Sequence, residues 1–402
     1  MKRLFTILLT LTVFFSLHAQ ETNGNNNDAN SFKFARQYFE MGIGTGFGFA
    51  NDFLGAHDVF NKNIQIDLNT ISNNIGEDGV NLETYLFAEF YIKFKKIEIG
   101  EGLWELGVFY QADGNIGSNL PKNLLSLVTE GNKNNSNVSG KISSTGGIFA
   151  EIGIGVAAQF GKLRLGVKPA FYVPLVFIPK SGINYVFDTT DGVLVSANGQ
   201  IDIYSPFAKN GEVKPGSDIT LEGSYAFFDF LEAGGSISRI PIFAPSLNNR
   251  MSITLSDLHW KMTGQQLIDG EEVKIPEFEF KEYYDTAEVK AYRPLRIDLF
   301  ASLKPFRKET FTLRPNAGFT FDINNKDVFI NAGLTAMLNA KNFFIFSIGT
   351  NREEGIRKQH LGFAFNLRAF ELNCEASLQS QNFIKSFELR GFGFDIGIRF
   401  GW

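Results

Sequence analysis

The chain has 402 residues, a net charge of −5, 40 Gly and 43 Phe. An acidic chain repels phosphate backbones, which argues against nucleic-acid binding, and the single Cys374 cannot form an internal disulfide. The length suits one large barrel, and the excess of Phe favours strands and the aromatic bands of membrane barrels.

Residues 1–19 have the pattern of a secretory signal peptide. Lys2 and Arg3 precede an apolar run from Leu4 to Leu17, and Ala19 is a small residue suited to cleavage. We therefore predict export with a cut after Ala19, followed by a polar leader over residues 20–37. The apolar run is shorter than the ~20 residues of a spanning helix, so entry into a membrane would have to use strands.

From residue 38 onward, apolar residues alternate with small or polar ones. In the first run Phe39 and Met41 oppose Glu40 and Gly42, because side chains in a strand alternate between two faces. Glycines continue at every second position to Gly48. This period of two argues against a phosphate-binding glycine loop and favours a crowded inner wall where only Gly fits.

The same alternation recurs to the end of the chain, with short turns between the runs. The clearest runs cover residues 39–49, 86–94, 104–110, 148–158, 163–175, 295–303, 311–321, 328–336, 361–367, 370–378 and 392–402. A closed meander leaves no edge, as a bilayer demands. We predict an all-β fold, a transmembrane antiparallel up-and-down β-barrel over 38–402 with about 14 strands, roughly 12 to 16. Residues 181–291 are ambiguous.

Two segments break the strand rhythm and are too apolar for free loops. Residues 51–72 contain Phe53, Leu54 and Phe60, and residues 121–130 contain Leu124 and Leu125 after a Pro suited to a helix start. Both are predicted as short helical inserts. They would plug the lumen as a hatch or form an apolar pocket near its mouth, and a lid packed on the rim is the alternative.

The predicted inner face mixes aromatic residues with alternating charges. Phe109, Phe149 and Phe300 stand on this otherwise polar face. Acids and bases there would pair across the lumen, and an obstructed lumen with aromatic patches suits a hydrophobic solute better than an ion or sugar. Arg296 and Arg314 are candidates for binding a fatty-acid carboxylate, because Arg does so bidentately. The alternative is that both only bridge lumen carboxylates.

The C-terminus resembles the closing-strand signal that the barrel-assembly machinery reads. Asp395, Gly397, Phe400 and Trp402 fill the four positions of that signal. The face from Phe392 to Trp402 is hydrophobic enough to contact lipid. The alternative is the last strand of a soluble β-sandwich.

Catalysis and metal binding find little support in the sequence. His57, His259 and His360 are scattered, and none has metal-ligand spacing to another His or to Cys. We therefore expect neither an enzyme nor a cofactor.

Taken together, the signal, the length, the insert after the first strand, the aromatic-rich barrel and the aromatic C-terminus resemble outer-membrane barrels of the long-chain fatty-acid transporter (FadL-like) family, in particular its divergent spirochaete-type members. The resemblance implies a 14-stranded barrel, an internal hatch and passage of hydrophobic compounds, with a lateral opening as one route. The Asn-Pro-Ala hatch motif of the better-known branch is absent before the first strand, and no family binding residue carries over.

The resulting expectation is an outer-membrane transport protein for hydrophobic compounds, with long-chain fatty acids as the first guess, working through a plugged barrel. Its partners would be membrane lipid, a hydrophobic small molecule and the barrel-assembly machinery. The alternatives are a structural or surface-interaction (adhesin-like) barrel and a general diffusion porin.

Overall fold

The computed structural model of this chain describes residues 38–51, 79–130, 137–190, 193–207, 213–248, 250–262, 280–285, 288–305, 310–340, 343–388 and 390–402. The predicted signal peptide, the leader and almost all of the first insert, including Phe53, Leu54 and Phe60, lie outside these residues and stay predictions. In the described part, no helix is long and apolar enough to cross a membrane.

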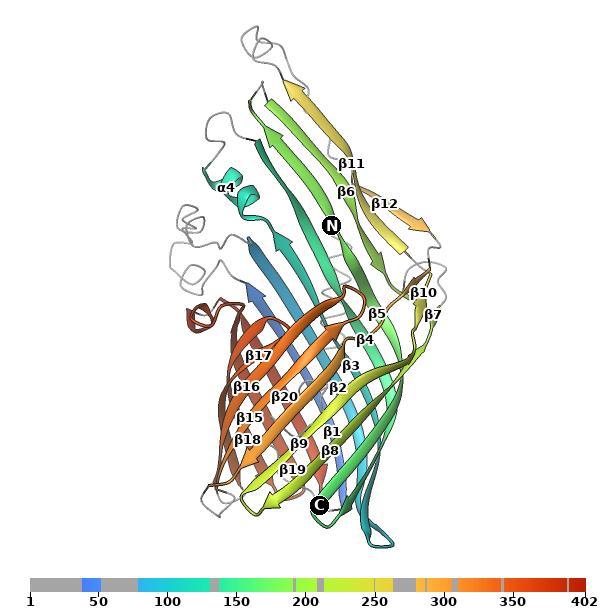
Figure 1. Ribbon diagram of the computed structural model, residues 1–402, viewed down its shortest axis with the longest axis vertical. Helices are drawn as coiled ribbons and strands as arrows, with labels where there is room; N and C mark the ends of the chain where they lie inside the picture. The colour runs from blue at the N-terminus through green and yellow to red at the C-terminus, as the bar shows by residue number, and fades with distance from the viewer. Residues whose placement is uncertain are drawn as a thin grey trace.

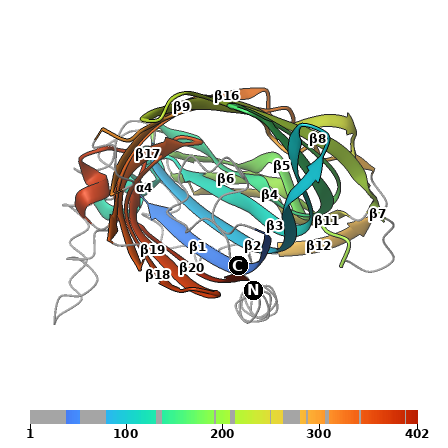
Figure 2. The same ribbon diagram turned by 90° about the horizontal axis from the view of Figure 1, so that it is seen from below.

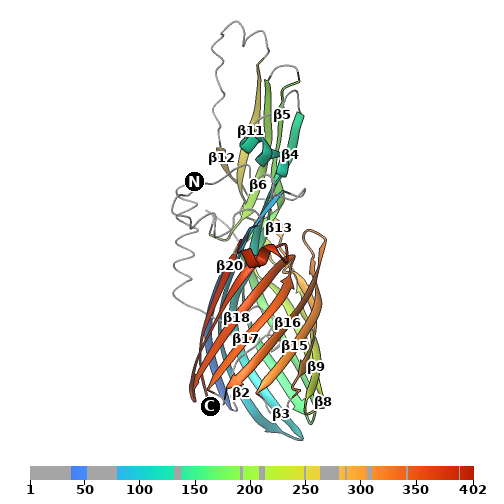
Figure 3. The same ribbon diagram turned by 90° about the vertical axis from the view of Figure 1, so that its left-hand side faces the viewer.

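A closed antiparallel barrel of 14 strands forms the body of the molecule (Figures 1 and 3). In the order given below, each strand pairs with the next, and the last pairs with the first. The strands are β1 (Phe39–Asn51), β2 (Val80–Ile99), β3 (Gly102–Leu120), β4 (Asn137–Phe160), β5 (Leu163–Asp188), β8 (Gly216–Phe228), β9 (Leu231–Phe243), β14 (Leu295–Leu303), β15 (Phe311–Asp322), β16 (Asp327–Ala340), β17 (Phe344–Glu353), β18 (Ile356–Leu367), β19 (Phe370–Ser380) and β20 (Phe392–Gly401).

The barrel is apolar outside and polar inside, as the alternation predicted. Ile348 and Leu361 point outward and are each 63% exposed, whereas Glu371 and Gln379 face the lumen and are fully buried. On β20 the exposed apolar face runs from Phe392 to Trp402. This is about 33 Å along a strand, or about 25 Å along the axis at a tilt near 40°, which matches the ~25 Å lipid band of membrane barrels.

The glycines of β1 make room on the inner wall, as predicted. A Cβ added to Gly42 would lie 2.4 Å from the ring of Tyr91, and one added to Gly46 would lie 1.6 Å from the Asp395 carboxylate. Only Gly therefore allows these neighbouring side chains to lie flat against the wall.

The two ends of the barrel differ. Short turns join strands at the lower end, where the start of β1 meets the end of β20: the Tyr38 amide donates to the Trp402 carbonyl at 2.8 Å. At the upper end β4 and β5 continue past the barrel and add β6 (Val193–Tyr204), β11 (Arg250–Met262) and β12 (Phe280–Asp285). We call this extension the tall wall (Figure 1). The ambiguous region 181–291 supplies most of it.

A small sheet fills the place where β5 leaves β8 for β6. It consists of β7 (Val213–Lys214), β10 (Ser246–Leu247) and β13 (Val289–Lys290). The fully buried Leu247 and Ala291 pack there against Phe149 and Tyr172. This cluster supports the segment that leads into β14.

The second insert is a helix, α4 (Lys122–Glu130), as predicted. Its Leu125 packs against Val80, which Leu82 and Leu120 also contact at the upper strand ends, and Figure 1 places the helix above the barrel. The structure does not show this insert as a plug of the lumen, since α4 lies above the barrel and its Leu125 packs against Val80 at a strand end.

Candidate functional site in the barrel lumen

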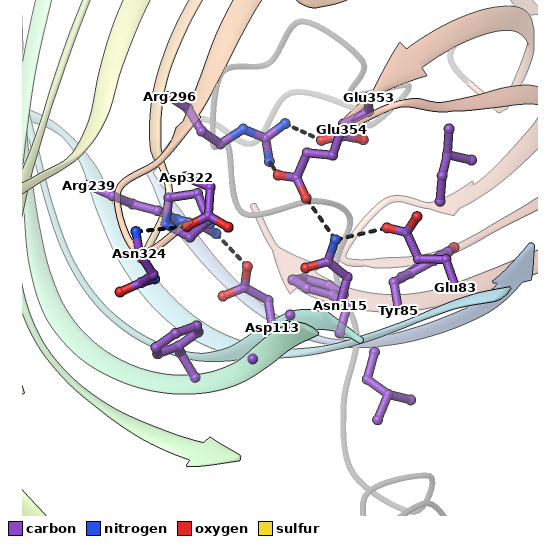
Figure 4. A pocket seen from close by; sticks show the side chains of 18 of the residues that line it. Glu83, Tyr85, Asp113, Asn115, Arg239, Arg296, Asp322, Asn324, Glu353 and Glu354 are labelled. Atoms are coloured by element: carbon purple, nitrogen blue, oxygen red, sulfur yellow. Dashed lines mark hydrogen bonds and ion pairs between the residues drawn. The ribbon is translucent and has the colours of Figure 1, made fainter. Parts of the chain in front are cut away.

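A cavity of about 100 Å³ lies in the lumen near the upper rim (Figure 4). One side of it is aromatic, with Phe87, Phe149 and Phe177 from β2, β4 and β5. The remaining lining mixes uncharged residues with charged ones, among which carboxylates outnumber bases. The charged lining residues are Glu83, Asp113, Asp322, Glu353 and Glu354 with Arg239, Arg296 and Lys358. The cavity is therefore amphipathic, with an acidic excess.

Arg296 of β14 is neutralised by the top of the β17–β18 hairpin, with β15 and β16 in between. It pairs with Glu353 and lies 4.0 Å from Glu354, and Lys358 lies 3.4 Å from Glu353. Glu354 belongs to the β17–β18 turn, beyond the strands. Burial raises the pKa of its carboxyl above the ordinary value, against the opposing charge of Arg296.

Side chains bridge nearly opposite walls of the lumen. Asn115 Nδ2 on β3 donates to Glu354 at 3.0 Å and to Glu83 at 2.8 Å. Asn325, in the β15–β16 turn, donates to Thr145 Oγ1 on β4 at 3.0 Å. The β15–β16 and β17–β18 turns thus fold inward toward β3 and β4, and these contacts obstruct the lumen. We call the upper ends of β15 to β20, which do not extend as far as the tall wall, the low rim.

Arg293, just before β14, is the centre of a second group of contacts. Its guanidinium donates to Glu151 at 2.8 Å and lies 3.2 Å from Asp113 and 3.4 Å from Asp218, and Arg293 is only 2% exposed. Burial alone would lower the pKa of Arg293, but these three carboxylates raise it above its ordinary value.

Arg239 also pairs with Asp113. It lies at a shift in the β8–β9 register and has a φ of 63°, so a bulge turns its side chain into the lumen. We call Arg239, Arg293, Arg296 and their carboxylate partners the upper cluster.

A lower cluster lies where the barrel closes. Arg399 Nη2 on β20 donates to both carboxylate oxygens of Glu371 on β19, each at 2.7 Å, and Arg399 Nη1 donates to Glu40 of β1 at 3.1 Å. Glu40 also accepts from Tyr91 and Lys95 of β2, each at 2.5 Å. Four consecutive strands are thereby joined around one buried carboxylate.

The predicted ligand-binding residues in the described part of the chain separate into three groups. Phe149 and Arg296 come together in the cavity lining. Phe109, Phe300 and Arg314 are in the lumen but do not line it: Phe109 covers Gly153, and the Arg314 guanidinium lies 5.8 Å from the Phe300 ring. Leu124 and Leu125 lie on α4, outside the lumen.

The C-terminal signal residues follow the predicted alternation. Asp395 faces the lumen beside Gly46, and Gly397 lies against the Asn373 side chain. Phe400 and Trp402 are exposed on the outer face. Recognition by the assembly machinery stays a prediction.

Sequence reasoning missed Arg239 and Arg293, since both fall in or beside the ambiguous region. The signal that marks them is an interruption of the alternation next to Pro: Arg239-Ile240-Pro241 and Arg293-Pro294. Among the described residues, no group of three or more His, Cys, Asp and Glu has the geometry to hold a metal.

No protein-family model matches this chain, and no curated protein matches it. Among solved structures, it is similar to the toluene transporter TbuX of Ralstonia pickettii, with 8% identity, a TM-score of 0.48 and coverage of 94% of this chain and 92% of that chain. It is also similar to the toluene transporter TodX of P. putida (9%, 0.46, 96% and 95%) and to a Pseudomonas aeruginosa FadL homologue (8%, 0.45, 93% and 92%). FadL-type barrels are thus among the similar structures, as the sequence resemblance led us to expect. Identities this low carry no substrate over to this chain.

Proposed function

We propose that this chain is an outer-membrane barrel that passes hydrophobic compounds through an obstructed lumen. The observation that carries the proposal is the bridging of nearly opposite walls, from Asn115 to Glu354, inside a closed barrel with an apolar outer belt. A diffusion porin needs a polar, water-filled passage. A lumen that side chains cross at the level of an amphipathic cavity suits a solute that first binds in the cavity and then passes through the lumen.

Long-chain fatty acids are the finer proposal for the substrate. The aromatic wall of Phe87, Phe149 and Phe177 would take part of the acyl chain, and Arg296 would take the carboxylate in place of Glu354. The cavity of about 100 Å³ is smaller than the ~150 Å³ of an engineered cavity that holds benzene. The cross-lumen contacts therefore have to part for an acyl chain to enter.

Uptake into liposomes tests both levels of the proposal. Refolded protein should speed entry of a labelled long-chain fatty acid and of an uncharged hydrocarbon over empty liposomes, with no effect on glucose. Absence of any acceleration would rule out the transport function. Deleting residues 52–72 adds a test of the first insert, which we propose as the hatch: its removal should change the uptake rate.

Arg296→Gln tests the fatty-acid assignment. The substitution should lower fatty-acid uptake about tenfold, because it removes a charge-assisted hydrogen bond of roughly 1.5–3 kcal/mol, and it should leave hydrocarbon uptake unchanged. Arg314→Gln is the matched control, since Arg314 is an equally buried lumen arginine that does not line the cavity. If both variants lower fatty-acid uptake equally, Arg296 does not bind the carboxylate.

A surface-interaction role is the second candidate, and the tall wall is the observation that favours it. β6, β11 and β12 extend the sheet beyond the barrel at the end that carries the long connections, which in membrane barrels faces outward from the cell. An antibody fragment against the tall wall separates the two roles. It should block binding of a soluble partner protein if this role holds, and leave solute uptake unchanged.

A further inference from the structure

The β19–β20 loop, residues 381–391, differs from the other upper turns of the low rim. The β15–β16 and β17–β18 turns bend inward, where Asn325 and Glu354 meet the opposite wall. The β19–β20 loop, which contains the short helix η1 (Lys385–Glu388), lies outside the wall (dark red in Figures 1 and 2). It exposes Phe383, Ile384 and Phe387 by 45%, 73% and 57%.

Polar contacts hold this loop in place from its inner side. Asn382 Oδ1 accepts from the amides of Ile384 at 2.9 Å and Lys385 at 3.3 Å. The fully buried Ser386 bonds to Gln359 of β18 at 3.1 Å. The exposure of the three apolar side chains is therefore built into the loop.

Two arginines lie next to the loop on the outer face of the same rim. Arg352 of β17 and Arg357 of β18 are direct cross-strand partners. Both point outward, because their neighbours Glu353 and Lys358 line the cavity inside. The Arg357 guanidinium lies 5.8 Å from the Phe383 ring, which joins the arginines to the apolar loop. We call Arg352, Arg357, Phe383, Ile384 and Phe387 the rim site.

Like charges directly opposite one another in a sheet are destabilising. In the described part of the chain Arg352 has no carboxylate within 4.0 Å. An anion between the two guanidinium groups would relieve this repulsion, and phosphate suits their fork geometry.

The height of the rim site fits a lipid headgroup. Phe392, at the upper end of the exposed belt, follows the loop directly. Arg357 lies four residues above the belt residue Leu361 on β18, which is about 13 Å along the strand and about 10 Å along the axis. The arginines thus reach the headgroup layer while the loop meets the top of the apolar belt.

We infer that the rim site binds a lipid of the surrounding membrane whose phosphate headgroup carries a net negative charge, with no cation of its own to repel the two arginines. Arg352 and Arg357 hold the phosphate, and Phe383, Ile384 and Phe387 pack against the acyl chains just below it. Aromatic and basic side chains side by side are the combination that interfacial anchors use. The inference rests on the outer-membrane location in the proposed function, but it does not require transport.

Lipid retention tests the phosphate half of the site. The protein is reconstituted with equal amounts of anionic and zwitterionic phospholipid, extracted in mild detergent, and its bound lipid is counted by native mass spectrometry. The wild type should retain the anionic lipid about tenfold more than the zwitterionic lipid, and Arg352→Gln/Arg357→Gln should lose this preference. Arg368→Gln, at the opposite end of the β18–β19 hairpin, is the matched control and should keep it.

Three results would overturn the assignment of a lipid phosphate. They are no preference in the wild type, a preference that survives in the double variant, and displacement of the lipid by millimolar inorganic phosphate, which would point to a free anion. Heat-modified mobility in gels confirms that each variant is a folded barrel before its lipid is counted.

A probe attached to the loop tests the apolar half. In a Cys374→Ser background, a spin label at Ile384→Cys should favour oxygen over a water-soluble nickel reagent in liposomes, as a label at Leu361→Cys in the belt does. A label at Asn198→Cys on the tall wall should show the opposite. An Ile384 label that behaves like the Asn198 label, or that is shielded from both reagents by a second copy of the chain, contradicts the inference. A Leu361 label that reacts as if in water would instead disprove the membrane location. Loss of solute uptake alone would contradict only the transport proposal.

Discussion

The two ion clusters of the lumen are built from the same residue types but connect the barrel differently. The lower cluster joins neighbours, because Arg399, Glu371 and Glu40 lie on consecutive strands. The upper cluster joins distant elements: Arg293 reaches the walls of β3, β4 and β8 from a segment outside the strands. A contact between adjacent strands can persist while a solute passes, whereas a contact across the lumen has to break.

The two clusters also differ in how completely their arginines are hydrogen-bonded. In the described structure the buried Nε atoms of Arg239, Arg293 and Arg296 have no hydrogen-bond partner, whereas Arg399 Nε donates to Glu371 at 3.2 Å. A buried donor without a partner costs about 1–3 kcal/mol. The arginines of the upper cluster are thus less completely hydrogen-bonded than Arg399, which suits a set of contacts that opens when a solute passes. The lower cluster suits a permanent lock on the barrel seam.

Arg399→Gln should have the largest effect, because it attacks the seam. It leaves Glu371 and Glu40 buried without their main counter-charge, which costs about 3–5 kcal/mol for a broken buried pair. Urea unfolding and heat-modified gel mobility measure the loss. Lys95→Met is the matched control, since Lys95 is partly exposed and should cost about 1 kcal/mol. Equal losses in the two variants would show that the seam is not locked by Arg399.

Arg293→Met should destabilise less but change permeability more. Glu151 and Asp218 lose this counter-charge while buried, but Asp113 keeps Arg239 and lines the cavity, so we expect a cost of about 3 kcal/mol, the low end for a broken buried ion pair. Losing the centre of the upper cluster should open the lumen to ions and raise single-channel conductance in planar bilayers. The Arg399→Gln variant, if it folds, should keep a low conductance. The reverse pattern would exchange the roles assigned to the two clusters.

The sequence predicts the lower cluster more fully than the upper one. Period-two alternation gives the outward face of β20 and the inward position of Arg399 and Glu371 directly, because a strand offers only two faces. It also gives the closed barrel and the place of Phe149 and Arg296 on its inner wall. Arg239 depends on a bulge with a positive φ, and Arg293 lies on an irregular segment, where no period indicates direction. The lumen neighbours of such residues follow from the closure of the whole barrel and could not be derived from local pattern.

Asn115→Ala narrows the comparison to one bridge. It removes the bonds to Glu83 and Glu354, which together contribute about 1–3 kcal/mol. Because the bridge crosses the lumen, we expect faster uptake of hydrophobic solutes, together with a loss of unfolding free energy of that size. Asn331→Ala is the control, since Asn331 bonds to Thr320 on the adjacent strand β15 and also accepts from the Glu354 amide. It should weaken the rim without speeding uptake. Slower uptake by the Asn115 variant would mean that the bridge guides the solute instead of blocking it.

Glu354→Gln should have the smallest effect, and the effect should depend on pH. The pKa of Glu354 is raised above 4.5 in the folded chain, so in the window between 4.5 and that raised value the folded chain binds more protons than the unfolded chain. The stability that Glu354 contributes is therefore fully present below this window and is lost as the pH rises through it. Glutamine stays neutral and still accepts a hydrogen bond from Asn115. The variant should therefore have the same melting temperature as the wild type at about pH 4 and a higher one at about pH 8. A melting difference that is constant with pH would mean that the raised proton affinity lies elsewhere in the upper cluster.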